Sequence, residues 1–255
     1  MTDKIRPILF TALLAGLIIG CAGAPAPTAR SSPTIPATPA PTLPPTPTPR
    51  PTIGLVEVST PAQAAALVFA SDERWGRMTP LRSDMVGQSS WYETSRDADG
   101  FTVMITFGEG DCQAGCIDRH TWTYHVDFAG TVELVWESGA DVGADPGAGG
   151  DGPAQITIDL TAGPTCPVET NPPDPNCAAR AVANAEVKLF DASGTEVATK
   201  MSDAQGRVVF EVPAGAYYAQ PQPVEGLMGT PEPQAFSVLG GDQAGLVFGY
   251  DTGIR

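Results

Sequence analysis

Apolar side chains recur at every second position along much of the chain after residue 90, and this alternation restricts those segments to β-strands. A period of two places alternate residues on one face of a strand, whereas a helix needs a period near 3.6. A strand at 90–94 and turn residues at 97–100 and 128–130 complete an antiparallel meander. The three alternating sets are Phe101, Val103, Ile105 and Phe107; His120, Trp122, Tyr124 and Val126; and Val132, Leu134 and Trp136.

One helix is predicted ahead of these strands. Thr60 can cap it, Pro61 suits its first position, and Gln63 completes a capping box. An Ala-rich segment continues from there to about Trp75. We expect the helix to cover one face of the meander, so that residues 54–140 form a small α+β domain.

A second group of short strands follows residues 141–152, whose Gly, Ala and Asp content is typical of a flexible linker. Short strands separated by Gly and Pro predict a β-sandwich over residues 153–255. The predicted fold class is therefore mainly β, with an α+β domain before a sandwich. The alternating residues are Ile156, Ile158 and Leu160; Val187 and Leu189; Val197, Thr199 and Met201; Val208, Phe210 and Val212; Phe236 and Val238; and Leu246, Phe248 and Tyr250.

Three segments of this half, residues 183–194, 202–210 and 213–217, resemble the carboxypeptidase regulatory-like, or prealbumin-like, domain. The family pattern has an Asp-x-x-Gly turn, a Ser/Thr-Asp-x-x-Gly hairpin and a Pro-x-Gly-x-Tyr turn. The matching residues here are Asp191 and Gly194, Asp203 and Gly206, and Pro213, Gly215 and Tyr217. The resemblance implies a prealbumin-like β-sandwich that acts as an accessory module without a conserved catalytic set. Such a fold does not by itself imply a function.

Residues 21–53 cannot build a core, because proline is interleaved there with Thr and Ala. This composition favours polyproline II, which extends about 3.1 Å per residue. We expect a disordered stalk that lifts the domains away from their attachment point. The prolines are Pro25, Pro27, Pro33, Pro36, Pro39, Pro41, Pro44, Pro45, Pro47, Pro49 and Pro51.

Residues 1–20 have the features of a signal peptide, with Lys4 and Arg6 ahead of an apolar stretch at 8–19. The stretch is shorter than the ~20 residues of an ordinary membrane span. It ends in Ile-Ile-Gly-Cys at Cys21, which resembles the bacterial lipobox. The resemblance implies that Cys21 receives a diacylglycerol and becomes the mature N-terminus. The chain is then lipid-anchored on the extracytoplasmic side of the cell membrane, at the cell surface or in the periplasm.

Cysteine usage agrees with export. Of the five cysteines, four remain once Cys21 is assigned to lipid, and they fall into the close pairs Cys112–Cys116 and Cys166–Cys177. Disulfides are expected in such a compartment. Alternatives for the first pair are a redox centre, or a metal site with His120 and His125, although the spacing differs from the usual two intervening residues. We therefore expect two disulfides, no metal and no cofactor.

The formal net charge of −15 disfavours nucleic acid as a partner, since phosphate binding needs Lys and Arg. No Gly-x-Ser-x-Gly, His-Glu-x-x-His or phosphate-binding Gly loop occurs. We expect a non-enzymatic binding or display module whose partner is a cell-wall glycan or an extracellular protein. The first candidates for its contact surface are Trp75, Trp91 and Tyr218. Two alternatives remain: an envelope redox or metal-handling protein using Cys112 and Cys116, and a small hydrolase that depends on His120 or His125.

Overall fold

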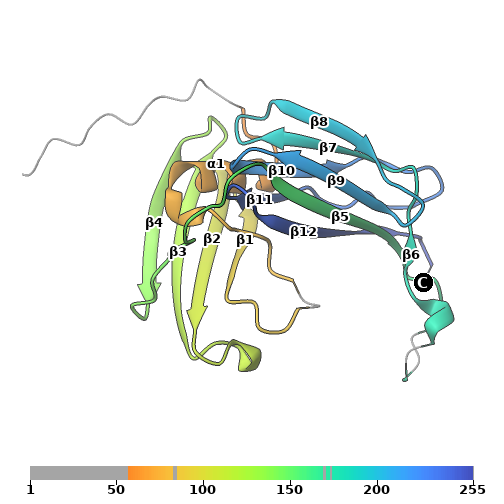
Figure 1. Cartoon of the computed structure of the whole chain (residues 1–255), viewed down its shortest axis with the longest axis horizontal. Helices are drawn as coiled ribbons and strands as arrows, with labels where there is room; N and C mark the ends of the chain where they lie inside the picture. The colour runs from red at the N-terminus through yellow and green to blue at the C-terminus, as the bar shows by residue number, and fades with distance from the viewer. Residues whose placement is uncertain (1–56, 83–84, 169–170, 173, 255) are drawn as a thin grey trace, which may run out of the picture. The chain divides into compact units, whose positions relative to one another are not determined.

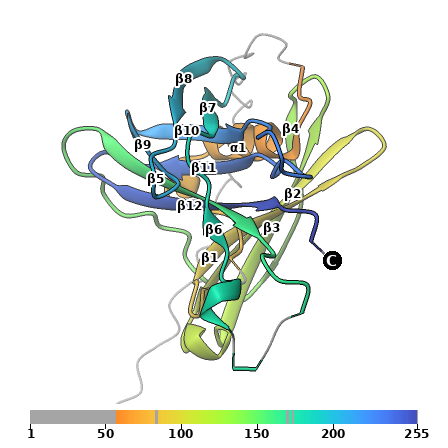
Figure 2. The same cartoon turned by 90° about the vertical axis from the view of Figure 1, so that its right-hand side faces the viewer.

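Strands dominate the part of the chain that the computed structural model describes, which is residues 57–255 without 83–84, 169–170, 173 and 255 (Figures 1 and 2). The predicted fold class, mainly β with one α-helix ahead of the first strand, is confirmed. The expected signal peptide, the lipid site Cys21 and the stalk lie outside the described residues. Within the described residues, no helix has the length and apolar character that crossing a bilayer requires.

The helix α1, Pro61–Ser71, begins as its sequence predicts and ends earlier. Thr60 Oγ1 accepts the Gln63 backbone N–H at 3.1 Å, and the Gln63 side chain accepts the N–H of Ser59, also at 3.1 Å. The helix ends at Ser71 because Asp72 adopts an extended conformation, with φ −151° and ψ 128°. A separate 3-10 turn, Glu73–Trp75, follows, so the predicted helix was four residues too long.

The first sheet is the predicted antiparallel meander, with strand order β1-β2-β3-β4. One of its faces packs against α1, where Phe101, Val103 and Ile105 are fully buried. Burial of each large apolar side chain contributes roughly 1.5–3 kcal/mol to the free energy of folding. The strands are β1 Ser90–Arg96, β2 Gly100–Glu109, β3 Asp118–Asp127 and β4 Val132–Gly139.

The second half is a sandwich of two sheets around its own apolar core. One sheet has the order β11-β10-β7-β8, and in the other β5 lies between β12 on one side and β9 and β6 on the other. The β5–β12 pair is parallel, which the sequence analysis did not anticipate. The strands are β5 Ala154–Gly163, β6 Arg180–Ala181, β7 Glu186–Asp191, β8 Glu196–Met201, β9 Arg207–Val212, β10 Gly215–Pro221, β11 Gln234–Val238 and β12 Gln243–Asp251.

Two hairpin turns of the sandwich are built as their sequences predict. Gly194 and Gly206 have φ of 84° and 75°, a region that glycine enters without steric cost. Asp191 accepts the backbone N–H groups two and four residues further on, at 2.9 and 3.0 Å. Asp203 does the same at 2.9 and 2.8 Å. Of the expected turn at residues 213–217, the last three residues are instead the start of strand β10.

The outer edge of β11 is closed by residues from the first half of the chain. The Tyr92 hydroxyl donates to the Ala235 carbonyl oxygen at 3.0 Å and accepts the Ala235 N–H at 2.8 Å. Further along, the Ser237 N–H donates to the Met78 carbonyl oxygen at 3.0 Å, and the Met78 N–H donates to Ser237 Oγ at 2.8 Å. We refer to these contacts as the β11 seam.

Apolar packing continues across the β11 seam. The cluster that contains α1 and the meander also includes Tyr218 of β10 and Ala235 of β11. The described residues accordingly all belong to one compact unit. The domain boundaries at 140 and 153 stay a prediction, but the two parts they separate share a core.

Candidate binding site

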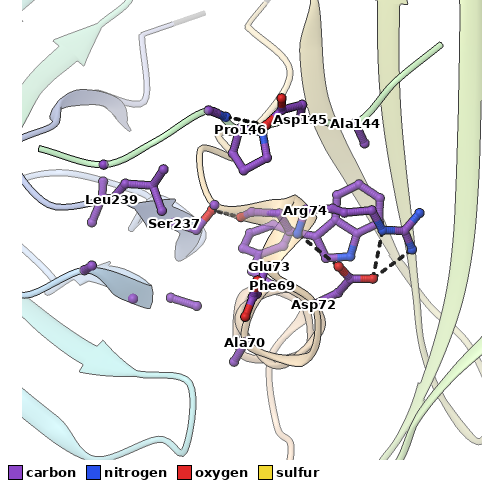
Figure 3. Close-up of a pocket in the computed structure, with 18 residues that line it drawn as sticks. Phe69, Ala70, Asp72, Glu73, Arg74, Ala144, Asp145, Pro146, Ser237 and Leu239 are labelled. Carbon is purple, nitrogen blue, oxygen red and sulfur yellow. Dashed lines mark hydrogen bonds and ion pairs between the residues drawn. The ribbon is translucent and has the colours of Figure 1, made fainter.

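A groove of about 740 Å³ lies where the end of α1 meets the edge of the sandwich (Figure 3). This volume is within the ~300–1,000 Å³ typical of ligand sites. Its walls come from four segments, at 69–76, 144–149, 214–216 and 237–239. Of the three aromatic residues that the sequence analysis proposed as a contact surface, Trp75 lines this groove, whereas Trp91 and Tyr218 do not. The four segments meet only in the folded chain. We call this feature the junction groove.

The first wall is the turn at the end of α1, which Asp72 holds in place. Asp72 Oδ1 accepts the Arg74 backbone N–H at 2.9 Å, and Oδ2 accepts two guanidinium N–H groups at 2.9 and 2.7 Å. The guanidinium carbon of Arg74 lies 4.7 Å from the Trp75 ring centroid and 5.5 Å from that of Trp122. Asp72, which leaves the helix, thereby fixes a cation at the rim of the groove.

The opposite wall is the end of β11 with the residues after it. Ser237 Oγ donates to the Trp75 carbonyl oxygen across the groove, as the dashed line in Figure 3 shows. Leu239 lies next to it and packs close to Gly76, where a Cβ would come within 2.9 Å of the leucine side chain. The two walls therefore approach closely at Gly76, where a larger residue would make the Leu239 side chain shift.

Arg77 fastens the third wall, which is part of the predicted linker. Its Nε and Nη2 donate to the Asp242 carboxylate at 2.9 and 2.8 Å. The same guanidinium donates to the carbonyl oxygens of Pro146 and, at 3.2 Å, Ala148. Residues 141–152 contain no helix or strand, yet their middle part is held against both halves of the chain.

The groove combines an apolar floor with a charged rim. Phe69, Pro146 and Leu239 supply apolar surface, while Asp72 and Arg74 are paired with each other. The hydrogen bonds that the Arg74 guanidinium donates to Asp72 raise the pKa of Arg74 above its usual value, so this cation persists at any physiological pH. An arrangement of this kind can hold a ligand that has both apolar and polar parts.

The expected contact surface of Trp75, Trp91 and Tyr218 is wrong, because all three side chains are buried. Trp75 packs edge-on against Trp122, with ring centroids 5.1 Å apart, inside the core under α1. Tyr218 stacks on Phe190 at 4.9 Å. These aromatic residues therefore stabilise the core.

The exposed tryptophan is Trp136 in β4, with 56% of its surface accessible. The sequence analysis placed Trp136 on the same strand face as Leu134, but the pairing register of β4 with β3 shifts between these two residues. Trp136 pairs with Thr123 and Leu134 pairs with Tyr124, so the two apolar side chains lie on opposite faces. The consecutive apolar residues Leu134, Val135 and Trp136 interrupt the alternation of β4 at the β-bulge, a signal that the sequence analysis did not use.

The four remaining cysteines are paired as expected. Disulfides join Cys112 to Cys116 and Cys166 to Cys177. The alternative metal site of the first pair with two histidines is not assembled, because both sulfurs of that pair are bonded to each other. Among the described residues, no group of three or more His, Cys, Asp or Glu side chains is placed to hold a metal ion.

The two histidines lie on opposite faces of β3 and apart from the junction groove. His120 contacts the Ala140 carbonyl oxygen at 2.6 Å and Glu137 at 3.0 Å, and its ring stacks on Trp122. His125 lies 4.0 Å from Asp99 near the opposite end of β3. Neither histidine lines the groove, so the residues of the alternative hydrolase are not brought to it.

Comparison with known proteins yields only remote likenesses. No family model matches the chain, and no curated protein matches it. Among solved structures, the shaft pilin SpaA of Lactobacillus rhamnosus GG is similar at 6% identity and a TM-score of 0.31, over 39% of this chain and 50% of that one. GBS52, the minor pilin of Streptococcus agalactiae, is similar at 8% and 0.32, over 58% and 68%. The Bacillus anthracis TIE protein is similar at 15% and 0.31, over 69% and 34%.

This chain thus covers half or less of two of those three structures. At TM-scores this low, the likenesses carry no argument about what the chain does. The assignment of a function therefore depends on the chain's own geometry.

The Arg77–Asp242 ion pair predicts how stability depends on acid. Hydrogen bonds from Arg77 lower the pKa of Asp242 below that of the unfolded chain, which is about 3.9. A lowered folded pKa contributes stability above the unfolded pKa, and this contribution is lost as the pH falls through the folded value. Asp242→Asn should therefore lower stability at neutral pH by up to about 1 kcal/mol, because the pair is partly exposed.

Below about pH 4 the difference between wild type and Asp242→Asn should shrink. Urea unfolding at a series of pH values measures this difference. Arg77→Gln, which removes the other partner, should show the same pH dependence. A difference that stays constant down to pH 2 would mean that the pair does not act electrostatically.

Proposed function

We propose that the chain is a membrane-anchored surface lipoprotein whose described part is a non-catalytic binding and display module. The junction groove carries this proposal. Its walls come from four separate segments, and they are held by hydrogen bonds that cross between the halves of the chain. A preformed groove loses less entropy when a ligand binds.

The sandwich half is proposed to be an accessory module of the prealbumin-like kind. The two Asp-Gly hairpin turns support this, because the residues that carry the resemblance form turns with the expected backbone geometry. The Tyr217 hydroxyl also donates to the Pro213 carbonyl oxygen at 3.1 Å, closing the third segment of the pattern. In this proposal the sandwich supplies one edge, β11, on which the binding half is built.

The ligand class follows from the chemistry of the groove and the expected surface location. The rim carries the Arg74–Asp72 ion pair together with the carboxylates of Glu73 and Asp145, so acidic groups outnumber basic ones there, and the floor is apolar. We propose a partner that presents apolar surface together with hydrogen-bond donors or positive charge. A cell-wall glycan and a basic segment of an extracellular protein both meet this description.

Blocking the groove tests the binding proposal. Ala70 is exposed and lines the groove, so Ala70→Trp should fill it without disturbing the core. Two probes represent the two ligand classes: an N-acetylglucosamine tetramer and a Lys-Phe amide. We expect at least one probe to shift the backbone NMR signals of residues 69–76 and 144–149, and Ala70→Trp to weaken that binding about tenfold or more.

Ala204→Trp is the matched control, since Ala204 is exposed in the turn between β8 and β9 and does not line the groove. Ala204→Trp should leave unchanged both the probe-induced NMR shifts and the affinity derived from them. If neither probe shifts groove signals, or if Ala70→Trp has no effect on the shifts, the groove is not a binding site and the binding part of the proposal fails.

The anchor is tested separately in cells. Cys21→Ala removes the thiol that the lipobox pattern assigns to lipid, so the protein should move from the membrane fraction to the soluble extracytoplasmic fraction. Ala24→Ser, three residues further on, should stay in the membrane fraction. Retention of Cys21→Ala in membranes would contradict lipid anchoring.

A further inference from the structure

We propose that the free edge of β4 is a docking strand for an extended segment of a partner protein, one with an apolar centre flanked by Lys or Arg. This proposal concerns a surface away from the junction groove and does not depend on it. β4 stands at the far side of the meander, at the left in Figure 1.

β4 is the strand of the first sheet that shows apolar side chains on both faces. Five successive residues, 133–137, are exposed, whereas β2 and β3 bury every second residue. The exposed fractions of Leu134, Val135 and Trp136 are 43%, 52% and 56%. Contiguous exposed apolar surface of this kind marks sites of protein–protein interaction.

The chain closes two other strand edges, those of β1 and β11, with its own residues. The outer edge of β1 is covered where the Leu81 N–H donates to the Tyr92 carbonyl oxygen at 3.2 Å and the Tyr92 N–H donates to the Thr79 carbonyl oxygen at 3.3 Å. The β11 seam closes the edge of β11. In the described part of the chain, β4 pairs with β3 and with no other strand. Its second row of backbone groups is therefore a template for an added strand.

The β-bulge at Val135 shapes how an added strand would be recognised. The bulge places Leu134 on the sheet face that packs against α1, and Trp136 on the outer face. An added strand would therefore contact Leu134 with residues on one of its faces and Trp136 with residues on its other face. Cross-strand apolar pairs contribute roughly 0.2–1 kcal/mol each, in addition to the backbone hydrogen bonds.

The charges around the apolar triplet define the partner. Glu133 and Glu137 flank Leu134–Trp136 on either side, and both are exposed. Pairing with a second copy would bring together two strands that each carry Glu133 and Glu137 and have no Lys or Arg among residues 132–139, and close like charges are destabilising. The whole chain has a net charge of −15, which adds to this repulsion. Bulges and flanking charges thus disfavour self-association and favour a basic partner.

A peptide selection on the purified full chain tests the proposal. Random peptides of about twelve residues, displayed on phage, are selected for binding and counter-selected on Val135→Lys. We expect enriched peptides to alternate apolar β-branched residues between Lys or Arg. Val135→Lys should weaken each selected peptide about tenfold or more, and N-methylation at alternate peptide residues should do the same because it removes strand hydrogen bonds.

Two controls distinguish binding at β4 from binding elsewhere on the protein. Val197→Lys changes a valine of similar exposure, 45%, on β8 of the sandwich and should leave peptide binding unchanged. Ala70→Trp, which blocks the junction groove, should also leave it unchanged. The proposal is overturned if no peptide is enriched or if the enriched peptides are acidic. It is also overturned if N-methylation leaves binding unchanged both at the odd-numbered and at the even-numbered peptide residues.

Discussion

The β11 seam is the contact on which the rest of the structure depends. A strand edge with free N–H and C=O groups would be costly to bury, because each buried polar group must be hydrogen-bonded. The Tyr92 hydroxyl satisfies both backbone groups of Ala235, and Met78 and Ser237 exchange two more hydrogen bonds. The helix and meander therefore pack on the sandwich in one defined position.

The candidate site follows from that position. Closing the edge of β11 brings the turn after α1 beside residues 237–239, and the junction groove lies between them. Arg77, one residue before Met78 in the seam, then holds Pro146 and Ala148 of the connecting segment.

Local sequence signals were sufficient for the elements but not for their assembly. Alternation of apolar residues located the strands from Phe101 to Tyr250 because most of these strands bury one face, although β4 and β8 do not, and Thr60 located the start of α1 because capping is local. Asp and Gly located two hairpin turns for the same reason. The cysteine pairs were predictable from their short separation.

Features that join distant segments could not be predicted in this way. The burial of Trp75 depends on Trp122, 47 positions later, and nothing near Trp75 indicates that contact. The face that Trp136 occupies depends on a β-bulge, and the apolar run Leu134–Trp136 interrupts the alternation without showing which residue is left without a partner. The groove and the β11 seam likewise arise only when residues far apart in the chain meet.

The most direct test of this account is whether the two halves unfold together. All four tryptophans lie between residues 75 and 136, so tryptophan fluorescence reports on the first half alone, while hydrogen exchange of β5 and β7 reports on the sandwich. In urea, both probes should share one transition. Tyr92→Phe leaves the Ala235 N–H and C=O unpaired and should destabilise both halves equally, by about 1–3 kcal/mol. A variant that shifts the fluorescence transition while the sandwich keeps its midpoint would show that the β11 seam does not couple the two halves.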